Sequence, residues 1–390
     1  MFEKPLVKTG TSQTLWFDER RAEFIPPPPQ HQRTSNNPPA NMSRIVVSLY
    51  FSLLVCQAAF TQDQQYKVAA IGFYNLENLY DTFDDPKKND EEFLPDGPRR
   101  WTMEVYQEKQ RNLARVISEL GTELTPDGVA ILGVAEIENR LVLEDLVKEP
   151  AIAHRNYEIV HYDSPDRRGV DVGLLYQPKY FTVTDSRAIP LKIYDDQKKR
   201  IYTRDILYVA GLFDGEPLHV LVNHWPSRRG GEAATQPYRN AAALVCKNVK
   251  DSLIRVDPNA KVIVMGDLND DPSSPSVKKV LDAKAKKKDV KPGGFFNPMH
   301  EFFQKGIGTM AYRDAWSLFD QIIISEGLIR EGQSGFRFYK ARVYNEKYLI
   351  QKTGQFKGYP FRTFDFDDYI GGYSDHFPVF IYLIKAVDQP

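Results

Sequence analysis

Apolar residues recur in runs of strand length along most of this chain. The seven clearest runs cover Val68–Phe73, Val129–Ala135, Val170–Tyr176, Leu218–Val222, Val262–Met265, Gln321–Ser325 and Pro378–Ile384. The second and fifth runs are almost continuous in apolar residues, which predicts strands buried on both faces. In the fourth run, alternation places Leu218, Val220 and Val222 on one face of a strand.

Two segments between these runs predict amphipathic helices. Glu104–Leu120 has apolar residues at helical spacing, and Pro237–Ile254 repeats an apolar residue every four positions. Asp282–Asn297 is rich in lysine and predicts a solvated surface segment. Because strands and helices are mixed along the chain, the pattern favours a layered α/β protein with a large core.

The first 61 residues have a different character. Residues 1–41 include Pro26–Pro29 and show no apolar periodicity, so we expect them to bury nothing. Met42 and Arg44 then precede the almost uncharged stretch Ile45–Phe60, which is typical of a secretory signal peptide. That stretch is shorter than the roughly 20 apolar residues of a membrane span, so a membrane anchor is disfavoured.

These patterns predict the organisation and location of the protein. We expect translation to start at Met42, residues 1–41 to be a non-native or disordered extension, 42–61 to be a signal peptide and 62–390 to form one domain. The expected product is secreted or periplasmic, has no stable membrane span and is a monomer.

Composition narrows the function classes. Lys and Arg total 51 against 52 Asp and Glu, and without the first 61 residues the formal charge is about −3, which excludes a basic protein that coats nucleic acid. The hydrophobic share of 42% excludes a chain that is disordered throughout. Only Cys246 follows the signal peptide, which excludes a disulfide scaffold and a Cys-rich zinc module.

Acids, amides and histidines cluster next to the predicted strands. They are Asn75, Glu77, Glu136, Glu138, His224, Asp267, Asn269, Asp320, Asp375 and His376. Each one alone is typical of a solvated surface or a turn. Six such segments in one chain instead predict a catalytic pocket, because ligands of open α/β sheets bind in the crevice at one end of the strands. The remaining histidines of the domain, which lack this context, are interpreted as structural: His154, His161, His219 and His300.

The donor types in this set favour a hard divalent cation. Carboxylates predominate, which suits Mg²⁺ or Mn²⁺ better than zinc. The sequence has no pair of histidines four residues apart in a zinc-protease pattern, no phosphate-binding glycine fingerprint and no Gly-x-Ser-x-Gly elbow. Serine-hydrolase and dinucleotide-binding functions are therefore disfavoured.

Taken in order, the six segments resemble the endonuclease/exonuclease/phosphatase superfamily, and in particular its secreted bacterial members. The resemblance covers about residues 67–385 and is carried by Asn75-Leu76-Glu77, Glu136, Asn223-His224-Trp225, Gly266-Asp267-Leu268-Asn269, Asp320 and Ser374-Asp375-His376. It implies a four-layer α/β sandwich, in which two mixed β-sheets pack face to face with helices outside. It also implies metal-dependent hydrolysis of a phosphate ester.

The resemblance assigns the metal and the base. Glu136 resembles the principal metal ligand of the family, with Glu77 and Asp375 close enough to assist. His376 resembles the general base, and Asp320 resembles the carboxylate that orients it. These types suit the chemistry, because a histidine with a pKa of about 6.5 can accept a proton from water at neutral pH and a carboxylate stabilises the imidazolium.

The resemblance also assigns the residues around the phosphate. Asn75, Asp267 and Asn269 resemble the group that positions phosphate oxygens and the attacking water. His224 resembles the second histidine, which contacts the phosphate and protonates the leaving oxygen.

Two arginine pairs and Trp225 bear on the choice of substrate. Arg168, Arg228 and Arg229 lie in paired-arginine loops that suit phosphate binding, although such pairs are more often solvated. Trp225 either stacks on a base or lipid group or packs internally. The leading hypothesis is a secreted nuclease or phosphodiesterase acting on DNA or RNA. The alternatives are a phosphatase of small metabolites or lipids, and a catalytically silent binding protein.

Overall fold

The structure, a computed structural model, describes residues 65–332 and 335–387. The predicted extension (1–41) and signal peptide (42–61) lie outside the described residues. Within the described ranges, no helix is both long enough and apolar enough to cross a membrane. Cys246 is buried and forms no disulfide in this part of the chain.

The first sheet contains six strands. They are β1 (Tyr66–Leu79), β2 (Val129–Ile137), β3 (Glu158–His161), β4 (Asp171–Tyr176), β16 (Arg337–Val343) and β19 (Val379–Ala386). The spatial order is β16-β19-β1-β2-β4-β3. The sheet is mixed, because β1 and β2 run parallel while the other neighbours are antiparallel.

The second sheet contains seven strands. They are β5 (Phe181–Ile189), β8 (Ile206–Phe213), β9 (Glu216–His224), β10 (Val262–Asp267), β11 (Ala283–Lys284), β12 (Phe295–Phe296) and β15 (Asp320–Ser325). The order is β11-β12-β15-β10-β9-β8-β5, and β9 and β10 run parallel. Three separate pairs of short strands are β6 (Ile193–Tyr194) with β7 (Arg200–Ile201), β13 (Met310–Tyr312) with β14 (Ala315–Ser317), and β17 (Phe364–Asp365) with β18 (Asp368–Tyr369).

The α-helices are few among the described residues. They are α2 (Met103–Glu119), α3 (Arg140–Leu146), α4 (Glu232–Val256) and α5 (His300–Gln304). Short helical turns lie at η1 (Glu91–Phe93), η2 (Ala153–Arg155), η3 (Ser276–Val280), η4 (Lys287–Asp289), η5 (Glu326–Leu328) and η6 (Lys347–Leu349). The start of α2 is fixed by Thr102, whose hydroxyl accepts from the Val105 backbone N–H at 3.5 Å.

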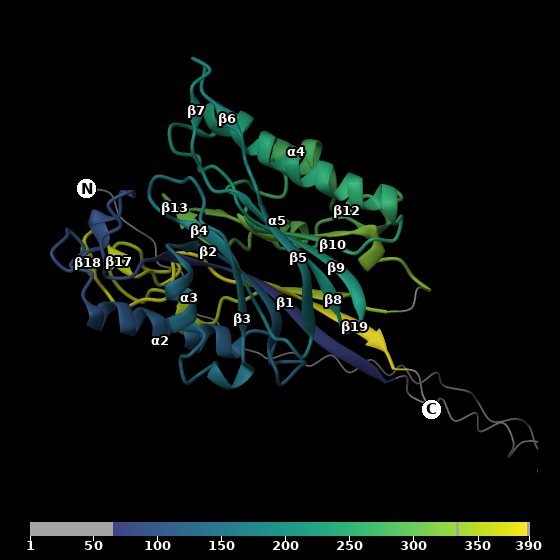
Figure 1. The fold of residues 1–390 in the computed structure, drawn as a ribbon, viewed down its shortest axis with the longest axis horizontal. Helices are drawn as coiled ribbons and strands as arrows, with labels where there is room; N and C mark the ends of the chain where they lie inside the picture. The colour runs from purple at the N-terminus through teal and green to yellow at the C-terminus, as the bar shows by residue number, and fades with distance from the viewer. Residues whose placement is uncertain (1–64, 333–334, 388–390) are drawn as a thin grey trace, which may run out of the picture. The chain divides into compact units, whose positions relative to one another are not determined.

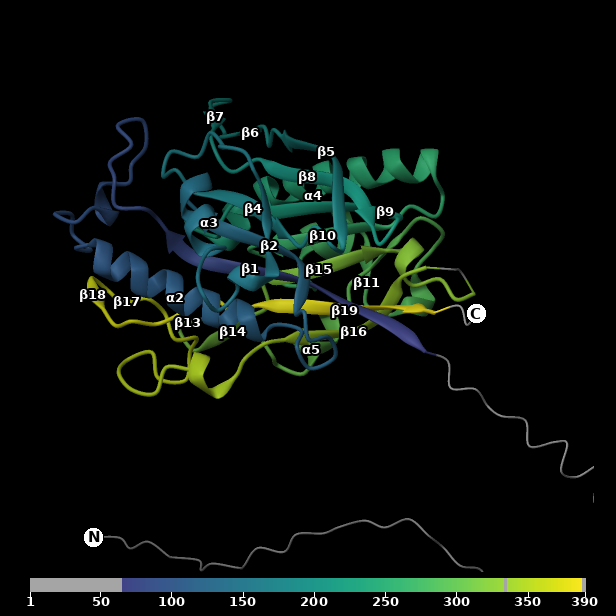
Figure 2. The ribbon, with the colours of Figure 1, turned by 60° about the horizontal axis from the view of Figure 1, so that its bottom comes forward.

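The two sheets form the middle layers of the described structure. Figures 1 and 2 show α4 on one side of the sheets and α2 and α3 on the other. The predicted four-layer α/β sandwich is therefore confirmed. The seven predicted strands correspond to β1, β2, β4, β9, β10, β15 and β19. All except β4 extend beyond the predicted runs, by one to six residues at one or both ends.

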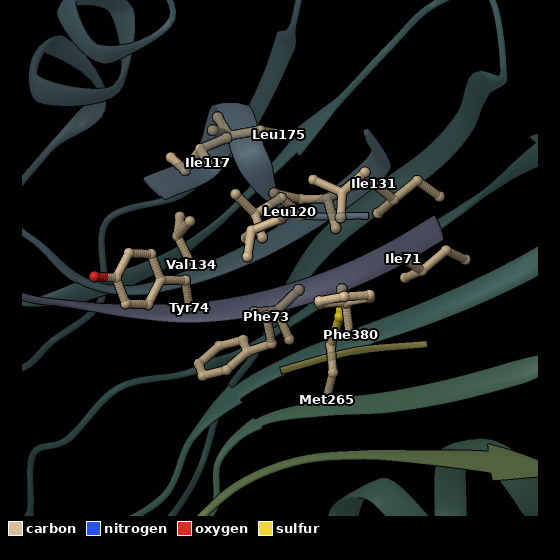
Figure 3. Close-up of a cluster of buried hydrophobic side chains, with 14 of the residues drawn as sticks. Ile71, Phe73, Tyr74, Ile117, Leu120, Ile131, Val134, Leu175, Met265 and Phe380 are labelled. Atoms are coloured by element: carbon tan, nitrogen blue, oxygen red, sulfur yellow. The ribbon is translucent and has the colours of Figure 1, made fainter. Parts of the chain in front are cut away.

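The core lies between the sheets and beneath the helices. Figure 3 shows Phe73 of β1 and Met265 of β10 on one side of the first sheet, with Ile117 of α2 and Val134 of β2 on the other. The predicted face formed by Leu218, Val220 and Val222 belongs to this core. The neighbouring Leu221 packs instead in a second cluster under α4, which confirms the predicted alternation.

Two predictions need correction. The helix expected from Pro237 begins at Glu232, because Arg239 donates to the Glu232 carbonyl (2.9 Å) and the Thr235 hydroxyl (2.7 Å) and so holds the turn before the proline. The lysine-rich Asp282–Asn297 is only partly a solvated segment. It includes β11 and β12, because its apolar pair Phe295–Phe296 is buried against β15.

We expect Phe73→Ala to lower the free energy of unfolding by about 3–5 kcal/mol, because a fully buried ring would leave a cavity between the sheets. Tyr339→Ala is the control, since Tyr339 of β16 is half exposed and should cost much less. Chemical denaturation measures both. Equal losses for the two variants would contradict the assignment of Phe73 to the core.

Candidate active site

The strand ends bring three predicted site residues into one row. Asp267, the last residue of β10, lies opposite His224 of β9 and opposite Asp320 of β15. The position of Asp267 beside His224 requires glycine at residue 266, because a Cβ there would lie 2.1 Å from the Asn223 carbonyl oxygen. Close pairing of β9 and β10 therefore requires glycine immediately before Asp267.

The first sheet supplies its side chains from irregular strand ends. The pairing registers shift between Asn75 and Leu79 of β1 and around Glu136 of β2. Glu77 and Glu136 have left-handed backbones, with φ of 50° and 58°. Such bulges redirect side chains, and strained non-glycine residues of this kind concentrate at functional sites.

His376 and Asp320 form a tight buried pair. His376 Nδ1 lies 2.6 Å from Asp320 Oδ2, and within the described ranges the other oxygen of Asp320 has no hydrogen-bond partner. Burial alone would lower the pKa of His376, but the charges of Asp320, Asp267 and Asp375 outweigh it and raise the pKa well above 6.5. The surroundings of His376 therefore move its pKa away from the value of an unperturbed histidine.

Asp267 lies at the centre of the site. Its Oδ2 accepts from Asn75 Nδ2 at 3.2 Å, and its Oδ1 accepts from the Asn269 backbone N–H at 2.9 Å. The Nε2 atoms of His224 and His376 lie 3.6 and 3.9 Å from Oδ2. Burial raises the pKa of Asp267 to about 7; the charge on His376 opposes this shift and that of Asp320 adds to it.

Three residues could hold a divalent cation. Ligand atoms of Glu136, His224 and Asp267 all lie within 4.8 Å of one another. Burial, reinforced by the charges of Arg204 and Arg168, lowers the pKa of His224 well below 6.5, so its imidazole is neutral and free of the charge that would repel a cation. His224 Nδ1 is buried without a hydrogen-bond partner in the described structure. This donor set fits a divalent metal ion.

Glu77 and Asp375, the other predicted ligands, lie beside this group and have partners of their own. Glu77 Oε2 accepts from the Thr363 backbone N–H at 2.7 Å and lies 3.5 Å from Lys109 Nζ. Asp375 Oδ2 accepts from Arg362 Nη2 at 2.9 Å. Burial and the charge of Asp375 together raise the pKa of Glu77.

Lys109 and Arg362, the cationic partners of Glu77 and Asp375, are not among the residues predicted from the sequence. Lys109 is fully buried in α2, where it also donates to the Tyr373 carbonyl at 2.7 Å. A signal existed, because Lys109 occupies the apolar stripe of α2 between Val105 and Leu113. Arg362 lies in a loop, and no pattern in the sequence distinguishes it.

The predicted substrate arginines have different surroundings. Arg228 donates to the Asn269 carbonyl at 2.9 Å and to Asp270 at 3.2 Å, so it holds the loop that carries Asn269. Arg168 lies 3.5 Å from Asp166 and acts electrostatically on His224. Arg229 is exposed, and its backbone N–H donates to Ser227 Oγ.

The other aromatic and histidine residues singled out from the sequence lie in structural contacts. Trp225 is fully buried and donates to Asn223 at 3.0 Å, so it packs internally and does not stack on a substrate. His219 is hydrogen-bonded to Tyr208 at 2.8 Å. His161 lies 3.1 Å from Asp171 and, with Asp163, forms a second group of ligand atoms within 4.8 Å of one another.

The chain is similar to known proteins in both sequence and structure. A sequence model of the endonuclease/exonuclease/phosphatase family matches residues 70–385. A search of curated proteins found no match. A family member from Bacteroides thetaiotaomicron is similar in structure at 15% identity, with 84% of this chain and 98% of that chain covered and a TM-score of 0.48.

Two further solved structures are similar at the same level. D. rerio TDP2 complexed with single-strand DNA product shares 15% identity over 81% of this chain and 99% of its own, with a TM-score of 0.48. A mannosyl-6-phosphatase from Bacteroides thetaiotaomicron shares 16% identity over 81% of this chain and 99% of its own, with a TM-score of 0.47. Such similarity does not indicate a substrate for this chain.

We expect Asp320→Asn to lower the pKa of His376, because the variant removes the nearest charge that raises it. An NMR titration of the metal-free protein measures this, and His219 serves as the internal control because its charge partner is Asp257. If the titration of His376 did not change, Asp320 would not be its electrostatic partner.

Proposed function

Because this chain belongs to the endonuclease/exonuclease/phosphatase family, whose members are metal-dependent phosphoesterases, we propose that it hydrolyses phosphodiester bonds by in-line attack of water. The buried His376–Asp320 pair carries the proposal, since it faces the carboxylates of Asp267 and Asp375 at distances of 3.9 and 4.0 Å. Three carboxylates around one histidine stabilise the imidazolium that forms when the histidine accepts a proton. A histidine with a purely structural role does not require such surroundings.

The proposed roles follow from the contacts. In its deprotonated form His376 accepts the proton of the attacking water at Nε2, and Asp320 at Nδ1 stabilises the charge that results. Because the surrounding carboxylates raise the pKa of His376, this form becomes more abundant as the pH rises. Asn75 and the Asn269 loop fix the orientation of Asp267. His224, neutral and buried, can contact a phosphate oxygen or the leaving group through Nε2.

A divalent cation, Mg²⁺ or Mn²⁺, would be held by the carboxylates of Glu136 and Asp267, with His224 Nε2 next to them. Glu77 and Asp375, the other predicted ligands, lie outside this group and have partners of their own. When bound, the cation would neutralise phosphate charge and polarise the phosphoryl oxygen. Oxygen donors predominate in this set, which is the preference of both ions.

The charge balance favours a diester over a monoester. The cations around the site are already paired: Arg168 and Arg204 with Asp166, Arg362 with Asp375, Lys109 with Glu77, and Arg228 with Asp270. A phosphodiester carries one negative charge and demands less compensation than a doubly charged monoester. DNA or RNA is therefore the proposed substrate, and phosphatase activity on metabolites or lipids is the alternative.

We expect the purified protein to hydrolyse plasmid DNA, RNA or an aryl phosphodiester with Mg²⁺ and to lose this activity with chelator. His376→Gln should reduce turnover by about 10²–10⁴-fold, because glutamine can still donate to Asp320 but cannot accept the proton. Circular dichroism would verify the fold.

Each other outcome of this assay has a distinct meaning. Release of phosphate only from monoesters would support the phosphatase alternative. Absence of metal-dependent hydrolysis of any ester by folded protein would support a silent binding protein. Near wild-type activity of His376→Gln would show that His376 is not the base.

We also propose that the protein is exported by the segment 42–61, on the strength of its basic start at Arg44 and its apolar stretch Ile45–Phe60. Amino-terminal sequencing of the exported product should find a start near Gln62. A product that retains Pro26–Pro29 would contradict the proposal.

A further inference from the structure

A cavity of about 220 Å³ opens beside the candidate active site. Glu77 and Asp375 are among its lining residues, and Asp375 Oδ1 lies 4.0 Å from His376 Nε2. A phosphate held near His376 would therefore have one of its ester groups within reach of this cavity. None of the roles assigned above uses its aromatic lining.

Four phenylalanines line this cavity: Phe93, Phe356, Phe364 and Phe366. We call it the aromatic cavity. Phe93 and Phe364 are largely buried, and Phe93 stacks on Tyr80 with ring centroids 4.3 Å apart. The rings of Phe356 and Phe366 are tilted by 44° to each other, with centroids 6.0 Å apart. Such rings offer stacking faces, and nucleobases and other planar groups bind to them.

Phe366 is held in a conformation that a phenylalanine rarely adopts. It lies in the turn between β17 and β18 with φ of 55°, and 68% of it is exposed. The Arg99 guanidinium donates to its carbonyl oxygen and so fixes the turn. A bulky residue kept exposed and left-handed is costly, and such residues concentrate at ligand-binding positions.

Two arginines complete the aromatic cavity. The Arg99 guanidinium lies 4.7 Å from the centroid of Phe364, and that of Arg362 lies 4.9 Å from the centroid of Phe356. Each arginine covers one face of its ring, so the wall presents guanidinium groups together with the ring surfaces that they leave uncovered. Arg362 also binds Asp375, which links this wall to the site.

We propose that the aromatic cavity binds a planar aromatic ring on the ester group of the substrate, and that Phe366 is a specificity-determining residue. This inference rests on the proposed phosphoesterase function. The volume agrees with one ring, since it lies below the roughly 300–1,000 Å³ of pockets for whole drug-sized ligands. The ring is either a nucleobase or a simple aryl group.

The test compares Phe366→Leu with the wild type on methyl phosphodiesters whose second group is benzyl, thymidine or cyclohexylmethyl. Leucine keeps an apolar side chain at the same backbone position but has no π face. We expect kcat/KM to fall about 2- to 12-fold on the benzyl or thymidine ester and to stay unchanged on the cyclohexylmethyl ester. Which aromatic ester loses more identifies the ring as aryl or nucleobase.

Tyr194→Leu is the matched control, because Tyr194 is a half-exposed aromatic residue of β6 in a different hairpin. It should leave all three esters unchanged. Equal losses on the aromatic and cyclohexylmethyl esters in Phe366→Leu, or no loss on any of them, would overturn the inference.

A binding measurement separates this inference from the proposed function. Isothermal calorimetry should show that the wild type binds benzylphosphonate more tightly than cyclohexylmethylphosphonate, and that Phe366→Leu loses the difference. If no ester is hydrolysed but this preference is present, the proposed function fails and the aromatic cavity stands. If esters are hydrolysed without any aromatic preference, the aromatic cavity fails alone.

Discussion

The hydrogen bond from Asn75 to Asp267 joins the two sheets at the edge of their shared core. Asn75 belongs to β1 of the first sheet, and Asp267 ends β10 of the second. Both side chains are almost fully buried, so breaking the bond would leave the Asn75 amide group and Asp267 Oδ2 without this hydrogen bond in a site that excludes water. The packing of Phe73 and Met265 sets the distance between the sheets, and this bond sets their alignment where the chemistry is proposed.

The second constraint is the burial of charged side chains, each of which lies next to a group that compensates its charge. Lys109, Arg239 and Asp320 are fully buried, and each lies against an opposite or titratable group: Glu77, Asp270 and His376. Removing one member of such a pair strands the other in a low-dielectric interior. For this reason a variant that keeps a hydrogen-bond donor is more informative here than truncation to alanine.

The sequence predicts the positions of the polar residues much better than their pairings. Strand ends are readable because apolar runs stop there, and this places Asn75, Glu136, Asp267 and His376 in one region. Which carboxylates share a centre depends on strand register and bulges, which the local pattern does not encode. Glu136 accordingly lies with His224 and Asp267, and Glu77 pairs with Lys109.

The elements of the fold also differ in how well the sequence predicts them. Ile206–Phe213 (β8) is an apolar run that could have been recognised, whereas the edge strand Phe181–Ile189 (β5) mixes polar and apolar residues and gives no clear period. α4 begins before Pro237 because Arg239 makes hydrogen bonds to the preceding turn. The local pattern of apolar and polar residues does not reveal side-chain contacts of this kind.

Gly266 is required both for the pairing of β9 with β10 and for the position of Asp267 in the candidate active site. Any side chain there collides with the backbone of β9, so a substitution must separate two central strands before it can alter chemistry. Drift at this position would be eliminated through loss of folding, even in a lineage that no longer needs catalysis. The glycine before Asp267 can thus persist in inactive descendants, and its presence in a related sequence would be weaker evidence of activity than the presence of His376.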